Sequence, residues 1–201
     1  SESLDLVFFA SAWDMASFDQ MLELDVELIK ICSADLVNVP MLRRTGETGL
    51  PVILSTGMSG WNDIDAAVEE LRAYHEKIVL LHCNSTYPCP EEEIGLPVIT
   101  RMAQRYGLPV GYSGHEQGLA PSVASAVFGA CVIERHFTLD KTMRGTDHQA
   151  SLDPKEFAEL ARMVREVEAS LKVTDKHVFD GEKSGAAKLR KSIVFTRDLP
   201  S

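Results

Sequence analysis

Two histidines of this 201-residue sequence lie in polar runs that each follow an apolar segment. His115 stands in Gly-Tyr-Ser-Gly-His-Glu, and His136 stands in Glu-Arg-His-Phe-Thr. Either one alone is commonly a hydrogen-bonded structural residue, but imidazoles from two neighbouring strand ends can bind one metal ion, and their paired placement favours a divalent metal. Glu134 precedes His136 by two residues. On a strand it therefore points the same way, as an acid, a base or a support for a metal ligand.

Lys30 lies inside the apolar run Leu-Ile-Lys-Ile-Cys-Ser, where an ammonium group is costly to bury unless it meets an anion. One interpretation is structural: the side chain reaches out to solvent or forms a salt bridge with Asp35. The functional interpretation is a ligand for a carboxylate or phosphate, and a Schiff-base nucleophile is a further option. His82, in Leu-Leu-His-Cys, is predicted equally well as a core or supporting residue and as a catalytic one.

Short hydroxyl side chains also gather after the apolar segments. Ser33, Ser55, Thr56 and Ser113 are each typical of turns and caps, but together with a lysine and backbone amides they can bind a phosphate. Asp147, in Arg-Gly-Thr-Asp-His, can bind sugar hydroxyls or cap a turn. The sequence contains no nucleophile-elbow, dinucleotide-binding or Walker motif.

These residues need elements that bring them together, and the chain alternates strand and helix patterns. Asp14, Asn62 and Asp153 precede the first, second and last clear helical patterns, while Gly107 and Gly129 are predicted to end two others. Six segments that are apolar on both faces predict short parallel strands covered by helices. The segments are Leu6–Ala10, Leu28–Cys32, Val52–Leu54, Ile78–Leu81, Pro109–Tyr112 and Ala130–Ile133.

Alternation of this kind predicts an α/β fold with a parallel sheet, either an open doubly wound sheet or a barrel. An open sheet binds ligands at one crevice, whereas a barrel carries its chemistry at the carboxyl end of nearly every strand. Polar residues follow all six predicted strands, which favours a (β/α)8 TIM-type barrel. The six βα units are fewer than the eight of a closed barrel, so the barrel is predicted to be incomplete here.

Composition excludes several other classes of protein. The formal net charge of -10 gives no broad basic surface for nucleic acid, and no apolar run approaches the ~20 residues of a membrane span. The opening Ser-Glu-Ser-Leu-Asp-Leu has no signal-peptide pattern. Four scattered cysteines are predicted to be buried thiols of a reducing compartment, so we expect a cytoplasmic protein. They are Cys32, Cys83, Cys89 and Cys131.

Several stretches, in this order along the chain, resemble the N-acetylneuraminate (sialic acid) synthase family. The family also includes synthases for legionaminic and pseudaminic acids. The resemblance spans about residues 8–154, and its motifs are jointly specific. The stretches are Lys30-Ile-Cys-Ser-Ala-Asp, Leu54-Ser-Thr-Gly-Met-Ser, Leu81-His-Cys-Asn-Ser-Thr-Tyr-Pro, Gly111-Tyr-Ser-Gly-His, Glu134-Arg-His-Phe-Thr-Leu-Asp-Lys and Gly145-Thr-Asp-His-Gln-Ala-Ser-Leu-Asp-Pro.

The resemblance implies roles for individual residues. His115 and His136 match the ligands of a manganese ion, with magnesium or cobalt as alternatives, and Glu134 matches an acidic residue of the same catalytic site. Gly114 departs from the aspartate that the family commonly has there, which puts the support of His115 in question. The matches to the phosphoenolpyruvate-binding positions are Lys30, Ser33, Ser55 and Ser113; Ser85 matches another small polar position, and Tyr87 and Asp147 match positions near the acceptor sugar.

The resemblance also implies a domain organisation. Residues 1–172 are expected to form the barrel domain without its first two strands. Residues 173–201 are expected to form a linker and the start of a truncated C-terminal antifreeze-like domain. That domain caps the neighbouring barrel in a homodimer of the family. We therefore expect the functional protein to be longer at both ends, with Leu6–Ala10 and Ala130–Ile133 as open edges of this part.

The activity implied by the resemblance is condensation of phosphoenolpyruvate with an N-acetylated amino sugar, such as N-acetylmannosamine, to a sialic acid-type sugar and phosphate. Carbon 3 of phosphoenolpyruvate attacks the open-chain aldehyde, water adds at carbon 2, and phosphate leaves by C–O cleavage. Two rivals remain open at this point. One is a Schiff-base pyruvate aldolase with Lys30 as nucleophile, and the other is a sugar-phosphate-binding barrel without turnover.

Overall fold

The computed structural model of the chain describes Leu4, residues 6–194 and residues 196–197. The chain divides into two units, residues 1–169 and residues 170–201. The second unit contains the helix α7 (Asp180–Leu189). Its predicted identity as a linker and the start of an antifreeze-like domain, and the predicted boundary after residue 172, stay predictions. In the described residues, no helix is both long and apolar enough to cross a lipid bilayer.

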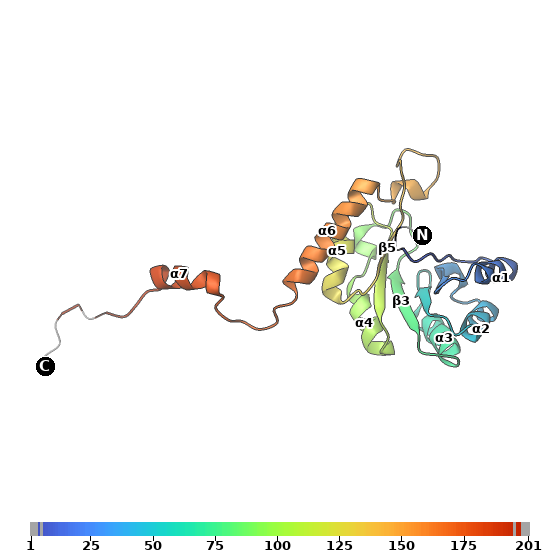
Figure 1. Cartoon of the computed structure of the whole chain (residues 1–201), viewed down its shortest axis with the longest axis horizontal. Coiled ribbons are helices and arrows are strands. Elements are labelled where there is room, and N and C mark those ends of the chain that lie inside the picture. Colours follow the sequence, from blue (N-terminus) through green and yellow to red (C-terminus); the bar gives the residue numbers. More distant parts are fainter. Residues whose placement is uncertain (1–3, 5, 195, 198–201) are drawn as a thin grey trace. The chain divides into compact units, whose positions relative to one another are not determined.

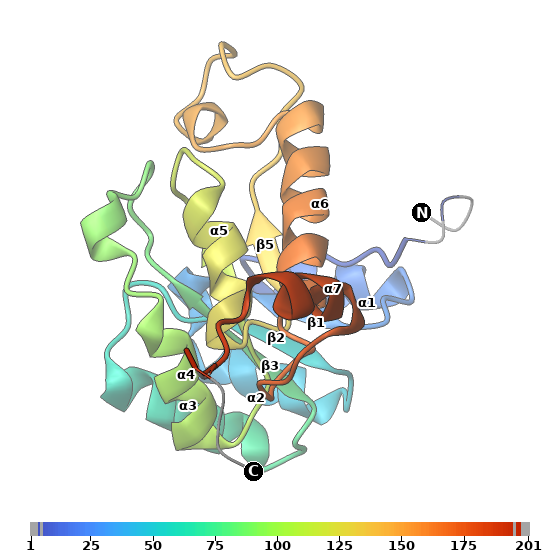
Figure 2. The ribbon, with the colours of Figure 1, turned by 90° about the vertical axis from the view of Figure 1, so that its left-hand side faces the viewer.

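Among its described residues, the first unit has five parallel strands in one sheet, in the order β1-β2-β3-β4-β5. Neighbours in sequence are therefore neighbours in space, as in the wall of a (β/α) barrel. Figure 1 shows α2, α3 and α4 beside the strands, and Figure 2 shows α5 and α6 beside β5. The strands are β1 (Ile29–Ile31), β2 (Val52–Ser55), β3 (Ile78–Cys83), β4 (Val110–Gly114) and β5 (Ile133–Arg135).

A helical element precedes the first strand and one or more follow each strand, so the fold class is α/β as expected. The helices of the first unit, in chain order, are α1 (Met15–Glu23), α2 (Val39–Glu47), α3 (Trp61–Arg72), α4 (Pro97–Tyr106), α5 (Ala120–Ser125) and α6 (Pro154–Ser170). Short 3-10 turns lie in three of the loops that follow strands, η2 (Ser33–Asp35), η3 (Glu91–Glu93) and η5 (Asp147–Gln149), and η4 (Ala126–Phe128) directly continues α5.

The core lies between the helices and one face of the sheet. Ile31, Leu54, Leu80 and Val110 are aligned in the register of four adjacent strands and are all buried. Their side chains join one cluster with helix residues such as Leu71 of α3. Because side chains alternate along a strand, the intervening residues point to the opposite face of the sheet. The register of the core therefore fixes which residues are left for that opposite face.

The local signals for helix ends are largely confirmed. Asp14 accepts a hydrogen bond from the Ser17 amide at 2.8 Å, and Gly107 ends α4 with φ of 62°. Asp153 and Glu156 form a capping box, in which each carboxylate accepts the other residue's backbone N–H at 2.8 and 3.0 Å. Asn62 was expected to precede its helix but lies in the first turn, because α3 already begins at Trp61.

Three sequence predictions at the sheet edges and beyond require correction. Residues 6–10 form no strand, so the described sheet has five strands instead of six and its edges are β1 and β5. The edge at Ala130–Ile133 is shifted towards the C-terminus: Ala130 still donates to Ser125 O in the preceding turn, Cys131 makes the first bond to Val110 O, and β5 itself begins at Ile133. Residues 191–200 also have the sequence pattern of a starting strand, but the described ones, 191–194 and 196–197, form none, and the others lie outside the described part of the chain. A strand is defined by its neighbour, which an apolar run alone does not specify.

The cysteines are partly as expected. All four thiols are free; Cys83 and Cys89 are buried and Cys32 is half-buried. Cys131 is exposed, contrary to the prediction of a buried thiol, because it lies in the turn before β5 and not within the strand.

Gly111 of β4 is the position where the sheet leaves no room for a side chain. A Cβ atom there would lie 2.5 Å from the carbonyl oxygen of Val132 and 2.6 Å from Cδ2 of Leu81. We predict that Gly111→Ala lowers the free energy of unfolding by about 2–3 kcal/mol, because a backbone atom cannot give way cheaply. Gly118→Ala is the control, since a Cβ atom on Gly118 would have nothing within 4 Å. Chemical denaturation of both variants measures the difference, and equal stabilities would contradict the packing described.

Candidate active site

The face of the sheet opposite the helix-facing core carries a row of polar side chains. Cys83, Ser113 and Glu134 are aligned in the register of β3, β4 and β5. Lys30 alternates with the buried Ile29 and Ile31, so it also points to this face. The parallel arrangement brings these side chains together because the carboxyl ends of all strands meet at the same edge.

The ammonium group of Lys30 is buried and has two polar partners. Its Nζ donates to Ser55 Oγ at 2.8 Å and lies 3.5 Å from Glu134 Oε2. The other carboxylate oxygen of Glu134 accepts from Ser113 Oγ at 2.8 Å. The four side chains form a continuous polar chain across the sheet. Asp35, the alternative ion-pair partner considered from the sequence, instead accepts hydrogen bonds from Cys32 and Asn38.

Ser33 and Ser85 approach this group from two loops. Ser33 Oγ accepts from the Gly57 amide at 3.0 Å, and it lies in the turn that directly follows β1. A Cβ atom on Gly57 would lie 2.2 Å from Ser85 Oγ and 2.8 Å from Ser33 Oγ. Glycine at this position therefore allows both hydroxyls to close in over the end of β2.

The two histidines lie side by side, with ring centroids 5.2 Å apart. Tyr87 lies against both, at 4.1 Å from the ring of His115 and 5.4 Å from that of His136. His115 Nδ1 is 2.6 Å from the carbonyl oxygen of Asn84. Because a carbonyl only accepts, this nitrogen carries the proton and Nε2 keeps its lone pair. His136 Nδ1 is 3.8 Å from a carboxylate oxygen of the exposed Asp147.

Burial controls the charge of these rings. Desolvation lowers the pKa of His115 below its usual value, and desolvation together with the neighbouring His115 lowers the pKa of His136. Both imidazoles are thus neutral at neutral pH, which is the form that binds a metal ion. Desolvation also raises the pKa of Tyr87 to about 12, so its hydroxyl keeps its proton. Within the described part of the chain, no three His, Cys, Asp or Glu side chains are grouped as a ready metal site.

All ten site residues predicted from the sequence line a single cavity of about 550 Å³. Two further residues named from the sequence lie elsewhere. Thr56 is buried and donates to the carbonyl oxygen of Leu81, and His82 pairs its Nε2 with the carbonyl oxygen of Ile94 at 2.6 Å. The ten lining residues are Lys30, Ser33, Ser55, Ser85, Tyr87, Ser113, His115, Glu134, His136 and Asp147.

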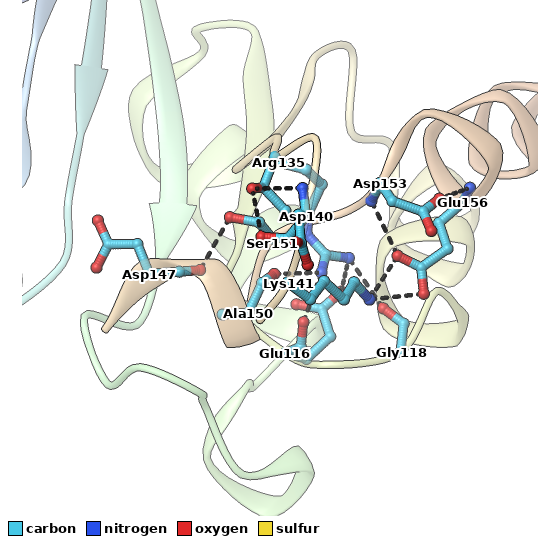
Figure 3. A network of polar contacts seen from close by, with 11 residues as sticks. Glu116, Gly118, Arg135, Asp140, Lys141, Asp147, Ala150, Ser151, Asp153 and Glu156 are labelled. Atoms are coloured by element: carbon cyan, nitrogen blue, oxygen red, sulfur yellow. Dashed lines mark hydrogen bonds and ion pairs between the residues drawn. The ribbon is translucent and has the colours of Figure 1, made fainter. Parts of the chain in front are cut away.

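The loop between β5 and α6 is held in place at both of its ends. Leu152 N donates to His136 O at 2.8 Å, and Thr138 N donates to Leu152 O at 3.0 Å, which closes the loop at its base. Lys141 binds the Glu156 carboxylate at 2.6 Å, and Figure 3 shows this contact beside the capping box of α6. Asp147 is therefore carried next to His136 by an anchored loop.

A buried ion pair beside the histidines was not found from the sequence. Glu116 follows His115 and Arg135 precedes His136, and their side chains meet at 3.0 Å with no exposed surface on either. Glu116 lies in a loop without periodicity, and Arg135 falls between Glu134 and His136, two residues that were themselves predicted to belong to the site. The nearest signal in the sequence was that a charged residue adjoins each histidine.

The chain matches the model of the NeuB family over residues 1–176. The chain belongs to the NeuB family. It is 38% identical to the N-acetylneuraminate-9-phosphate synthase of Homo sapiens, over 100% of this chain and 56% of that protein. It is 37% identical to the N,N'-diacetyllegionaminic acid synthase of Legionella pneumophila, over 99% of this chain and 57% of that protein. This NeuB-family chain thus spans a little more than half the length of these relatives.

A solved structure agrees with the family assignment. The N-acetylneuraminic acid (sialic acid) synthetase of Leptospira borgpetersenii serovar Hardjo-bovis, in complex with citrate, superposes with a TM-score of 0.85 at 31% identity. The match covers 96% of this chain and 68% of that one. The family and the TIM-type barrel fold expected from the sequence are therefore confirmed.

His82 provides a test of the electrostatics around the site. Burial lowers the pKa of His82 below 6.5, so the fold prefers the neutral ring, and its contribution to stability is lost as pH falls below that value. We predict that His82→Gln, which keeps a donor for Ile94 O but cannot titrate, loses less stability between pH 7 and pH 5 than the wild type. Thermal unfolding at both pH values measures this. His177→Gln, at an exposed position of the second unit, is the control and should keep the wild-type dependence.

Proposed function

We propose that this chain carries the donor-binding and metal-binding part of an enzyme that condenses phosphoenolpyruvate with an N-acetylated amino sugar. The products are a sialic acid-type nonulosonate and phosphate. The observation that carries the proposal is the single cavity in which the buried Lys30 and its hydroxyl neighbours face two neutral imidazoles. Membership of the NeuB family supports this class of reaction.

The donor would bind at Lys30. Phosphoenolpyruvate carries a phosphate and a carboxylate, and a buried ammonium with several hydroxyl donors neutralises such a group more strongly than solvent-exposed lysines do. Ser55 and Ser113 already lie in the hydrogen-bonded chain with Lys30, and Ser33 and Ser85 reach the same cavity from the adjacent loops. The donor therefore lies between the ends of β1, β2 and β4.

The two histidines fit a divalent ion, for which we propose Mn²⁺, with Mg²⁺ or Co²⁺ as alternatives. Both rings are neutral, and the bond from His115 Nδ1–H to Asn84 O leaves Nε2 of that ring available as a ligand. His115 and His136 would hold the ion through their imidazole nitrogens. When bound, the ion supplies Lewis-acid polarisation of the sugar aldehyde.

The residues of the chain would guide the remaining steps. Lys30 holds the donor so that its carbon 3 faces the aldehyde, and the π electrons of the donor form the new C–C bond while the aldehyde oxygen takes a proton from solvent water. Water then adds to carbon 2; cleavage of the bond between carbon 2 and the phosphate oxygen releases phosphate, which takes the proton of the carbon 2 hydroxyl as the ketone forms. Glu134, the carboxylate at 3.5 Å from Lys30, is placed to accept the proton of that water.

The acceptor sugar would lie against Tyr87 and Asp147, which line the cavity beside His136. A protonated phenol and an exposed carboxylate are suitable partners for sugar hydroxyls. A homodimer and a cytoplasmic location, both expected from the sequence, complete the proposal.

The function is tested by phosphate release from phosphoenolpyruvate in the full chain as the cell makes it, with a panel of N-acetylated amino sugars and Mn²⁺. Release that depends on both the donor and one sugar is expected. No release with any sugar would contradict the synthase. Trapping of a pyruvate adduct on Lys30 by borohydride would favour a Schiff-base aldolase instead.

Lys30→Ala should weaken phosphoenolpyruvate binding at least about 30-fold, because it removes the buried cation that faces a multiply charged ligand. Isothermal titration calorimetry measures the affinity directly. Lys77→Ala is the matched control, since Lys77 is exposed and binds only the carbonyl oxygen of Gly49 among the described contacts of its ammonium. Unchanged donor affinity in the Lys30 variant would rule out this donor site.

His136→Gln should abolish measurable binding of one Mn²⁺ ion and leave donor binding in the absence of metal unchanged, because only the metal uses the imidazole. Calorimetric titration with MnCl₂ measures the first, and titration with phosphoenolpyruvate measures the second. His177→Gln, in the exposed part of the second unit, should bind Mn²⁺ as the wild type does. Retained Mn²⁺ affinity in the His136 variant would refute the two-histidine site.

A further inference from the structure

A fully buried ion pair adjoins the two histidines along the chain. Glu116 and Arg135 are adjacent in sequence to His115 and His136, respectively, and neither side chain of the pair has any exposed surface. Neither residue lines the cavity, so neither touches a substrate there. Their position suggests a role that acts through the histidines.

Every carboxylate oxygen of Glu116 is hydrogen-bonded. Oε2 accepts from the Tyr112 hydroxyl at 2.8 Å. Oε1 accepts from the Ser122 hydroxyl at 2.5 Å and from Arg135 Nη1 at 3.0 Å. One carboxylate therefore joins β4, the first turn of α5 and the end of β5. Because Glu116 lies one residue after His115, these bonds fix the backbone that carries the first imidazole.

Arg135 connects the same point to the loop of the second histidine. Its Nη1 donates to Gly118 O at 2.9 Å, and its Nη2 donates to Glu116 O at 2.5 Å and to Ala150 O at 3.3 Å. Figure 3 shows Arg135 among these groups, with Ser151 bonded to the backbone of Asp147 next to Ala150. Arg135 thus holds the loop whose Asp147 carboxylate faces His136.

A buried ion pair such as Glu116–Arg135 is weak evidence for a gain in folding stability. Two charges without solvent lose much hydration, and a buried pair is often no more stable than well-packed apolar residues. Removing one partner, however, leaves the other charge buried without compensation. Among the described residues, Arg135 Nε has no hydrogen-bond partner even with the pair intact. The arrangement that such a pair specifies is therefore a better explanation of its presence than net stability.

Gly114 depends on the same carboxylate. A Cβ atom at position 114 would lie 2.6 Å from Glu116 Oε2, 2.8 Å from a ring carbon of Tyr112 and 3.0 Å from Arg135 Cδ. The glutamate at 116 therefore occupies the volume that a side chain at 114 would need. A carboxylate placed on residue 114 would, in turn, lie beside Arg135, provided that Glu116 were shortened.

We propose that the Glu116–Arg135 pair is a positioning device that sets the spacing and orientation of the two imidazoles, and that Gly114 leaves the volume which the Glu116 carboxylate occupies. The inference rests on the proposed function only for the identity of the metal. Glu116 and Arg135 act on the reaction through His115 and His136 and do not contact the reacting atoms.

The first experiment compares Glu116→Gln with Asp65→Asn in the full chain. Asp65 is a matched control because it also accepts bonds from an arginine and a tyrosine, Arg105 and Tyr106, but between α3 and α4. Glu116→Gln is expected to weaken Mn²⁺ binding by about 10- to 100-fold, the range typical of residues that support metal ligands, with metal-free donor binding within about threefold. Asp65→Asn should leave both affinities unchanged. Wild-type Mn²⁺ affinity in a folded Glu116→Gln protein would overturn the proposal.

The second experiment moves the carboxylate and stays decisive if Glu116→Gln fails to fold. Gly114→Asp alone should lower stability and Mn²⁺ affinity, because it collides with Glu116 and adds a second buried acid. In a Tyr112→Leu background, which removes the ring carbon 2.8 Å from a Cβ atom at position 114, Gly114→Asp combined with Glu116→Ala should regain at least about tenfold of the Mn²⁺ affinity that Glu116→Ala loses, because Arg135 again has an acidic partner. No gain over Glu116→Ala in the same background would contradict a positioning role.

A metal-independent measurement separates this inference from the function. In protein labelled at histidine, NMR cross-peaks between the rings of His115 and His136 are expected in the wild type and should be lost in Glu116→Gln while Asp65→Asn keeps them. If these changes occur but no sugar supports phosphate release, the synthase proposal fails and the positioning role holds. If the cross-peaks persist in Glu116→Gln, the positioning role fails whatever the activity.

Discussion

An ammonium group buried in an apolar strand must be surrounded by oxygen atoms, and Lys30 meets this requirement with Ser55 and Glu134. Glu134 belongs to the far edge strand of the described sheet, so the bond spans β1 to β5. It can form only if the intervening strands are parallel, in register and curved towards each other. The contacts of Lys30 and the packing of the helix-facing core thus favour the same curved parallel sheet.

The sequence was sufficient wherever the signal was local or repeated. The Asp153–Glu156 capping box and the glycine at the end of α4 follow from neighbours in the chain, and the site residues follow from the rule that parallel strand ends converge. Pairing between segments that are far apart in the chain has no such local signal. Residues 6–10 have the apolar pattern of a strand but form none here, and the partner of Lys30 is the distant Glu134, not the nearby Asp35.

The glutamate at 116 shows a second limit of sequence reasoning. Gly114 raised the question of what supports His115, because the expected acid was absent at that position. The structure contains an acid in the same volume, but it comes from two residues further along the chain and turns back. A comparison of sequence positions finds no acid at residue 114, but the structure has the carboxylate of Glu116 in that volume. Buried charges are constrained by location in space and only indirectly by location in sequence.

The carboxylate of Glu156 serves two structures at once. It caps the first turn of α6 through the Asp153 amide and binds Lys141 in the loop that carries Asp147. Fraying of that helical turn frees the carboxylate from its fixed position and so weakens the anchor of the loop, and opening of the loop weakens the cap in the same way. The position of the loop beside His136 is thereby linked to the stability of a helix end, so a change in the first turn of α6 is also a change in the support of Asp147.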